Sequence, residues 1–161
     1  MEKIKNAQDS IRTFMEACEQ EVNYTPKVPS KEAVYLRAKL TLEEVTEFIE
    51  ALFNGESRKL PYTKMVFVSL RAAMSALELA SKHQDFNPKD VNMKEVLDAI
   101  TDIEYVNIGA ANTFGFDLEE SFNIVHGSNM SKLVDGKAVK DEFGKVIKGP
   151  NYYPPNLDGL Y

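Results

Sequence analysis

Residues 93–114 read MKEVLDAITDIEYVNIGAANTF, and their apolar side chains recur every three or four positions. This is the spacing of a helix that buries one face. The sequence GFD at 115–117 then turns the chain. We therefore predict a long amphipathic helix whose buried stripe contains Val96, Ala99, Ile103 and Val106.

The same helical spacing returns on both sides of this segment. The loop NYTPKVPS interrupts it with two prolines, and Ser30 at the end of that loop is placed to cap the next helix. Four or five helices with short connections indicate an all-α fold, built as an antiparallel bundle. The four further helices are predicted at about residues 2–21, 31–53, 62–83 and 117–130.

The C-terminal residues 134–161 have a different character, with glycine, proline and lysine in place of a helical period. We predict an extended basic tail there, and a short hairpin is one form that part of it could take. The expected organisation is one helical domain at 1–133, with residues 134–161 forming the tail of the same domain.

Composition limits the class of protein. A chain of 161 residues can bury the core of one domain, and its net charge of −6 argues against a general nucleic-acid binder. No apolar run is long enough to cross a membrane, and the N-terminus resembles neither a secretory signal nor a transit peptide. The single cysteine, Cys18, excludes an internal disulfide and fits the reducing cytoplasm, and its place on an apolar stripe favours a role in the core.

The predicted helices have wide apolar faces for so small a domain. Part of that surface is therefore expected to meet a second copy of the chain. We predict a homodimer or a homotetramer.

Two pairs of carboxylates lie beside the predicted buried stripes. Glu44 and Glu47 are three residues apart in LTLEEVTEFIE, so both lie on one side of their helix. Asp98 and Asp102 are four residues apart on the helix at 93–114, again on one side. Two helices that bring such pairs face to face would form a site of oxygen ligands, which Mg²⁺ or Mn²⁺ prefers.

Structural explanations compete with this metal site. Thr41-x-x-Glu44 matches a capping box, in which Glu44 would only cap a restarted helix. Glutamate runs also form solvated surfaces. Asp98 and Asp102 could be an exposed pair, although like charges at this spacing cost a few tenths of a kcal/mol.

Three blocks of sequence resemble one known superfamily. LRAKLTLEEVTEFIEAL at 36–52 is similar to the first signature of the all-α NTP pyrophosphohydrolases, which include MazG, the dimeric dUTPases and phosphoribosyl-ATP pyrophosphohydrolase. LDAITDIEYVNIGAANTFGFDLEESF at 97–122 is similar to the second signature. VHGSNMSKL at 125–133 and GKVIKGPNYYPPNL at 144–157 are similar to the ending of MazG-like members. The resemblance implies a Mg²⁺-dependent hydrolase that cleaves a nucleoside triphosphate to the monophosphate and pyrophosphate by water attack at the α-phosphate.

The resemblance also assigns roles to residues. It makes three carboxylates magnesium ligands: Glu44, Glu47 and Asp102. The position where the family often has a fourth acid is Ala99 in this chain, so we assign the fourth ligand to Asp98 and keep Glu95 in reserve. The general base is Glu44 or Glu47. The long insertion between the signatures, which holds the helix at 62–83, departs from the family pattern.

The expected contacts with the triphosphate substrate come from the C-terminal half of the chain. The resemblance in SNMSKL points to Asn129, and ammonium groups pair with phosphate as point charges. The candidates are Asn129, Lys132, Lys145, Lys148 and Tyr105. The lysines could instead form a solvated tail, and Tyr105 could pack in the core. His126 lies near the end of a short helix and is expected to cap that helix or to fill space beside it. A non-catalytic helical module that binds a nucleotide or a protein partner remains the alternative function. A di-iron bundle is discounted, because this sequence lacks the Glu-x-x-His pairs that such a site requires.

Overall fold

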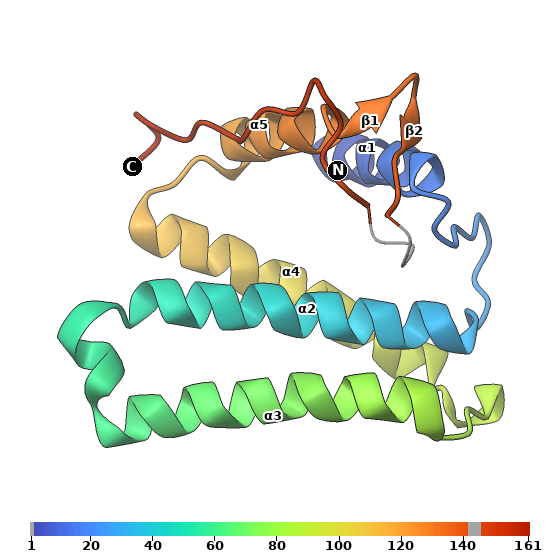
Figure 1. The fold of residues 1–161 in the computed structure, drawn as a ribbon, viewed down its shortest axis with the longest axis horizontal. Coiled ribbons are helices and arrows are strands. Elements are labelled where there is room, and N and C mark those ends of the chain that lie inside the picture. The colour runs from blue at the N-terminus through green and yellow to red at the C-terminus, as the bar shows by residue number, and fades with distance from the viewer. Residues whose placement is uncertain (1, 142–145) are drawn as a thin grey trace. The chain divides into compact units, whose positions relative to one another are not determined.

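The computed structural model describes residues 2–141 and 146–161 and confirms the all-α prediction (Figure 1). Its five helices are α1 (Glu2–Ala17), α2 (Lys31–Leu52), α3 (Pro61–His83), α4 (Met93–Phe114) and α5 (Leu118–Met130). Two short 3₁₀ helices, η1 (Gly55–Lys59) and η2 (Pro88–Asp90), lie in the connections. The strands β1 (Leu133–Val134) and β2 (Lys137–Ala138) form an antiparallel hairpin in the tail.

The helix ends follow from local side chains. Ser30 caps α2 as predicted, because its hydroxyl oxygen accepts a hydrogen bond of 3.2 Å from the backbone N–H of Ala33. Asp117 caps α5 by accepting from the N–H groups of two residues in the first turn. Gly115 ends α4 in the left-handed conformation, with φ of 76°, where a side chain would be strained.

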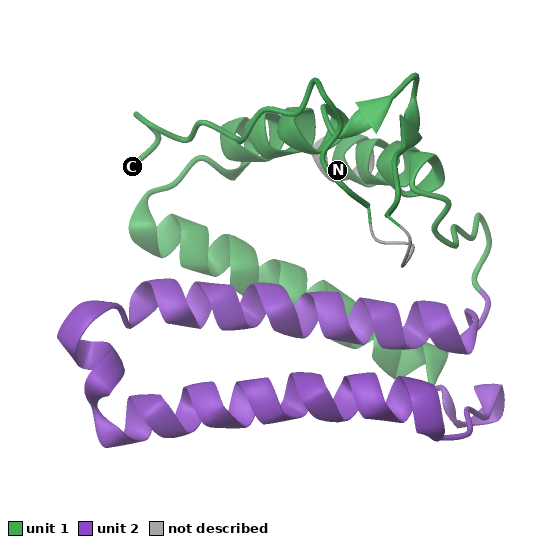
Figure 2. Cartoon of the chain, in the orientation of Figure 1, with its two compact units in different colours: residues 1–26, 92–161 green, residues 27–91 purple. Residues whose placement is uncertain are grey.

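The chain forms two compact units, shown in different colours in Figure 2. The unit at residues 27–91 is an antiparallel hairpin of α2 and α3, joined by η1. Its open end is closed by a hydrogen bond of 2.6 Å from the Lys31 ammonium to the carbonyl of Gln84. Thr46 and Phe67 are the buried side chains of this unit, and the Thr46 hydroxyl donates to a carbonyl within α2.

The other unit contains residues 1–26 and 92–161, and in it α1 packs against α5. Cys18 is buried, as the sequence predicted for a core cysteine. The tail is tied to the end of α5, because the buried Ser128 hydroxyl donates to the carbonyl of Tyr153 at 2.7 Å. The N–H of Tyr153 donates in turn to the Ser131 hydroxyl at 3.1 Å. The tail is therefore an ordered strap over α5 in the part that the structure describes.

Part of the tail forms a short hairpin, one of the forms that the sequence left open. Asp135 and Gly136 connect β1 to β2, with φ of 51° and 75°. Positive φ at both central residues is typical of a type I′ turn, for which Asp-Gly is a favoured sequence.

The apolar stripe of α4 is exposed, contrary to the prediction that it is buried. The exposed fractions are 43% for Val96, 52% for Ile103 and 69% for Val106. Helical periodicity shows that a face is apolar but does not show what covers it. Val45 and Leu52 on α2 are exposed in the same way.

Among the helices that the structure describes, none is both long enough and apolar enough to cross a membrane.

Candidate functional site

The first acidic pair lies on an unbroken helix. α2 runs without interruption from Lys31 to Leu52, so Thr41 does not begin a helix and Glu44 does not cap one. The capping-box explanation for Glu44 is therefore excluded. Glu44 and Glu47 are both exposed, one helical turn apart, and available to a ligand.

The electrostatics of this pair fit a cation site. Burial raises the pKa of Glu44 above its ordinary value, and the negative charges of Glu47 and Glu43 raise it further. Among the described residues neither Glu44 nor Glu47 forms an ion pair, whereas Glu50, one turn further along, binds two arginines. A cation between Glu44 and Glu47 would relieve their repulsion.

The second pair lies on α4 in the other unit. Asp98 and Asp102 are exposed at adjacent turns, and within the described ranges no basic side chain neutralises either of them. Glu95 lies in the first turn of α4, where a carboxylate interacts favourably with the helix dipole. Because this position gives Glu95 a structural role, Asp98 stays the predicted fourth ligand and Glu95 the alternative. Tyr105, on the same side of α4, is 80% exposed, so the alternative of core packing is excluded in this chain.

The donors of both pairs are carboxylate oxygens, which suit hard Mg²⁺ or Mn²⁺ rather than zinc. In the described part of the chain, no three such side chains gather into a metal-binding group. Each acidic pair is therefore described within its own unit.

The candidate substrate contacts at the end of α5 lie together. The Lys132 ammonium donates a hydrogen bond of 2.7 Å to the side-chain oxygen of Asn129. Lys148 lies with its ammonium 4.4 Å from the centre of the Tyr152 ring, a cation–π contact. Lys145 lies outside the described residues.

His126 is placed by packing. Its ring stacks on that of Phe122, with centroids 5.8 Å apart and an angle of 2° between the planes. This fits the expected filling role on α5.

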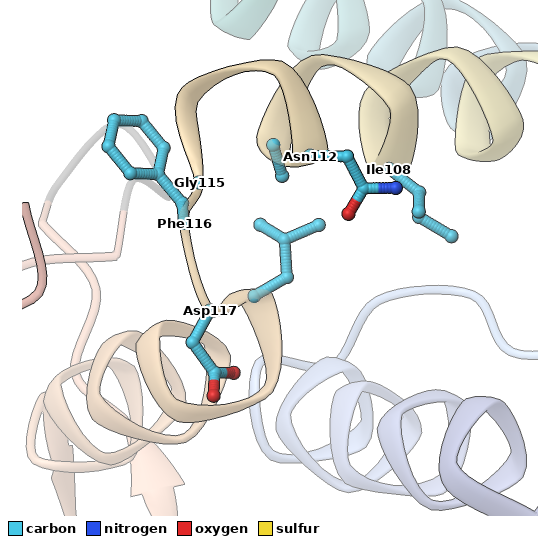
Figure 3. Close-up of a pocket in the computed structure, with 7 residues that line it drawn as sticks. Ile108, Asn112, Gly115, Phe116 and Asp117 are labelled. Carbon is cyan, nitrogen blue, oxygen red and sulfur yellow. The ribbon is translucent and has the colours of Figure 1, made fainter.

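A hollow of about 480 Å³ lies at the turn from α4 to α5 (Figure 3). Its lining is apolar at Ile108, Phe116 and Leu118, with the amide of Asn112 among them. Asn112 is ten residues after Asp102 on α4, which places it about 80° around the helix from Asp102. The sequence analysis did not single out Asn112.

A second hollow, of about 370 Å³, lies in the α2–α3 unit. It is lined by the basic residues of η1 and of the first turns of α3, above the buried Phe67. Local sequence spacing does not reveal this hollow, because its residues come from different elements of the insertion between the two acidic helices. The basic residues are Arg58, Lys59, Lys64 and Arg71.

Comparisons with known proteins agree with this architecture. A family model described as phosphoribosyl-ATP pyrophosphohydrolase matches residues 11–129, which include both acidic pairs. The crystal structure of a candidate NTP pyrophosphohydrolase from Exiguobacterium sp. 255-15 is similar in fold, with a TM-score of 0.69 and 23% identity over 93% of this chain and 89% of that one. No curated protein matches the chain. The chain belongs to the phosphoribosyl-ATP pyrophosphohydrolase family, within the all-α NTP pyrophosphohydrolase superfamily.

Proposed function

We propose that this pyrophosphohydrolase is Mg²⁺-dependent and converts a nucleoside or deoxynucleoside triphosphate to the monophosphate and pyrophosphate. The observation that supports it best is the exposed pair Glu44 and Glu47, which the described structure leaves without an ion pair on an unbroken α2. Asp98 and Asp102 supply a second such pair on α4. Together these four carboxylates would hold the metal, with Mn²⁺ as a possible substitute.

In the proposed reaction, a water oxygen forms a bond to the α-phosphorus and the bond from that phosphorus to the α–β bridging oxygen breaks. The bridging oxygen leaves with pyrophosphate. Glu44 or Glu47 takes the proton of the water. Bound Mg²⁺ supplies neutralisation of the phosphate charge.

The contacts at the end of α5 would bind the substrate rather than drive the chemistry. Asn129 holds the Lys132 ammonium at one place, so this cation is oriented before a phosphate arrives. Lys148 and Lys145 are further proposed phosphate contacts from the tail, and Tyr105 is a proposed contact on α4. Each adds attraction for a polyanion outside the metal shell.

The exposed apolar stripes support a homodimer or a homotetramer. Val96, Ile103 and Val106 on α4 together leave an apolar face open to solvent, and large faces of this kind mark association sites on small domains. A single buried cysteine supports a cytoplasmic location for the assembly.

A panel of nucleoside triphosphates tests the proposal. Each is incubated with the protein in Mg²⁺, in Mn²⁺ and in EDTA, and the nucleoside monophosphate and pyrophosphate are separated by chromatography and measured directly. We expect the two products to appear in equal amounts, and only when a divalent ion is present. Equal turnover in EDTA would contradict the metal site. Nucleotide binding with no turnover of any member would favour the non-catalytic module instead.

A further inference from the structure

The hollow in the α2–α3 unit has a charge unlike that of the rest of the chain. Four cationic side chains line it, in a protein whose net charge is −6. Two glutamates counter them, because Glu50 pairs with Arg58 and Arg71 and Glu56 pairs with Lys59. Lys64 has no acidic partner among the described residues, so positive charge remains in excess. Such a hollow concentrates anions.

The two arginines are oriented and yet still able to bind. Each places an Nη2 atom on the same oxygen of Glu50, at 2.8 Å from Arg58 and 3.2 Å from Arg71. A guanidinium has five N–H donors, so most donors of both groups remain available. Their side chains are 41% and 64% exposed, and these donors can therefore reach a ligand from solvent.

The aromatic ring of Phe67, which lines the hollow, further restricts the Arg58 guanidinium. Arg58 lies over the ring of Phe67, with its guanidinium carbon 5.0 Å from the ring centre. Phe67 is only 6% exposed, so the ring is held by the packing of α2 and α3. α3 also begins here, at Pro61, with its positive dipole end toward its first turn.

The hollow lies next to the first acidic pair within the same unit. Glu50, which holds both arginines, is three residues after Glu47 on α2. This corresponds to a rise of about 4.5 Å along the helix. A polyphosphate whose inner phosphates meet a metal at Glu47 could therefore extend its outer phosphates toward Arg58 and Arg71.

We propose that this basic hollow, formed by Arg58, Lys59, Lys64 and Arg71, binds the γ-phosphate of the triphosphate substrate. The inference rests on the proposed function and adds a distal-phosphate site on the insertion between the two acidic helices. The hollow then selects triphosphates over diphosphates, since a diphosphate lacks the group that reaches it. Arginine suits this role because its planar fork matches two phosphate oxygens at once.

A purely structural role for these arginines predicts a different result. In that case Glu50 and the two arginines only tie η1 to α2 and α3. Replacing Glu50 by Gln would then act like replacing an arginine, by weakening the tie. In the binding role, Glu50→Gln removes a competing negative charge while keeping the shape of the side chain, so affinity for polyphosphate rises.

The test is calorimetric titration of the full chain with inorganic tripolyphosphate in EDTA, which requires no turnover. We expect Arg71→Gln and Lys64→Gln each to weaken binding by about three- to tenfold, and Glu50→Gln to strengthen it. Lys82→Ala is the matched control, because Lys82 lies at the other end of α3, paired with Glu78. Unchanged binding in Arg71→Gln and Lys64→Gln, or weaker binding in Glu50→Gln, would overturn the inference.

Kinetics separate this inference from the proposed function. If the wild type hydrolyses triphosphates, Arg71→Gln should raise KM for the triphosphate and leave KM for the matching diphosphate unchanged. Equal changes for both would count against a distal-phosphate site while leaving the hydrolase standing. If the wild type hydrolyses no nucleotide, the proposed function fails, and the titration still decides whether the hollow binds polyphosphate.

Discussion

The charge of Glu47 helps to raise the pKa of Glu44, one helical turn earlier on α2. The two carboxylates are close enough to repel each other, and the described structure gives neither an ion pair. Because a bound cation would turn this repulsion into attraction, the pair is better suited to a metal-bound state than to a metal-free one.

Removing one charge from either acidic pair should therefore stop turnover. We expect Glu47→Gln and Asp102→Asn each to lower kcat by about a hundredfold or more, with the double variant little worse than either alone, because groups that share one ion are not additive. Glu104→Gln, an exposed glutamate on α4, is the control. Initial rates at saturating nucleotide measure the effect. Wild-type kcat in a folded Glu47→Gln protein would place the metal elsewhere.

The fourth ligand is decided by a second comparison on α4. We expect Asp98→Asn to lower kcat and to weaken Mn²⁺ binding, while Glu95→Gln changes both little, because Glu95 lies in the first turn near the helix end. Titration with Mn²⁺, followed by its electron paramagnetic resonance signal, measures affinity apart from activity. The reverse pattern would make Glu95 the ligand.

The raised pKa of Glu44 predicts how stability depends on pH. A folded-state pKa above the unfolded value means that the folded chain binds the proton more tightly, so stability falls as pH rises between the two values. The penalty is complete above the raised pKa, and Glu44→Gln removes it. In EDTA, the Tm of Glu44→Gln should exceed that of the wild type at about pH 7.5 and match it at about pH 3.5. A Tm gain of equal size at both pH values would show that charge is not the cause.

The lysines at the end of α5 and in the tail should affect substrate binding. Lys132→Ala and Lys148→Ala are each expected to raise KM by about three- to tenfold and to leave kcat within about twofold, since each removes attraction outside the metal shell. The control is Lys137→Ala, in the exposed hairpin strand β2. A fall in kcat without a change in KM would instead place these lysines at the reacting phosphate.

The exposed stripe of α4 should be an interface between copies. Val106, 69% exposed, is expected to lie in it, so Val106→Asp should convert a dimer or tetramer to smaller species by introducing an unpaired charge. Light scattering coupled to size-exclusion chromatography at micromolar concentration measures the mass. A monomeric wild type would contradict this prediction.

The sequence predicted the features that depend on neighbouring residues. Helical periodicity located the five helices, and the Ser30 cap needs only the next three residues. Burial of the α4 stripe could not be predicted, because it depends on what covers Val106 rather than on the pattern around it.

Contacts between residues that lie far apart in the chain could not be predicted from the sequence either. Arg71 meets Glu50 across 21 residues, and only the hairpin of α2 and α3 brings them together. The basic hollow was missed for this reason. The acidic pairs were found because each lies within one turn of one helix, where spacing alone places both members.

The most direct test of the central claim is the fate of oxygen in the products. The protein is incubated with Mg²⁺ and a nucleoside triphosphate in water enriched in oxygen-18. The products are then separated, and their masses are measured by mass spectrometry. Attack at the α-phosphorus predicts a nucleoside monophosphate that carries one heavy oxygen, together with unlabelled pyrophosphate. Labelled pyrophosphate with an unlabelled monophosphate, or a nucleoside diphosphate with phosphate, would contradict the account.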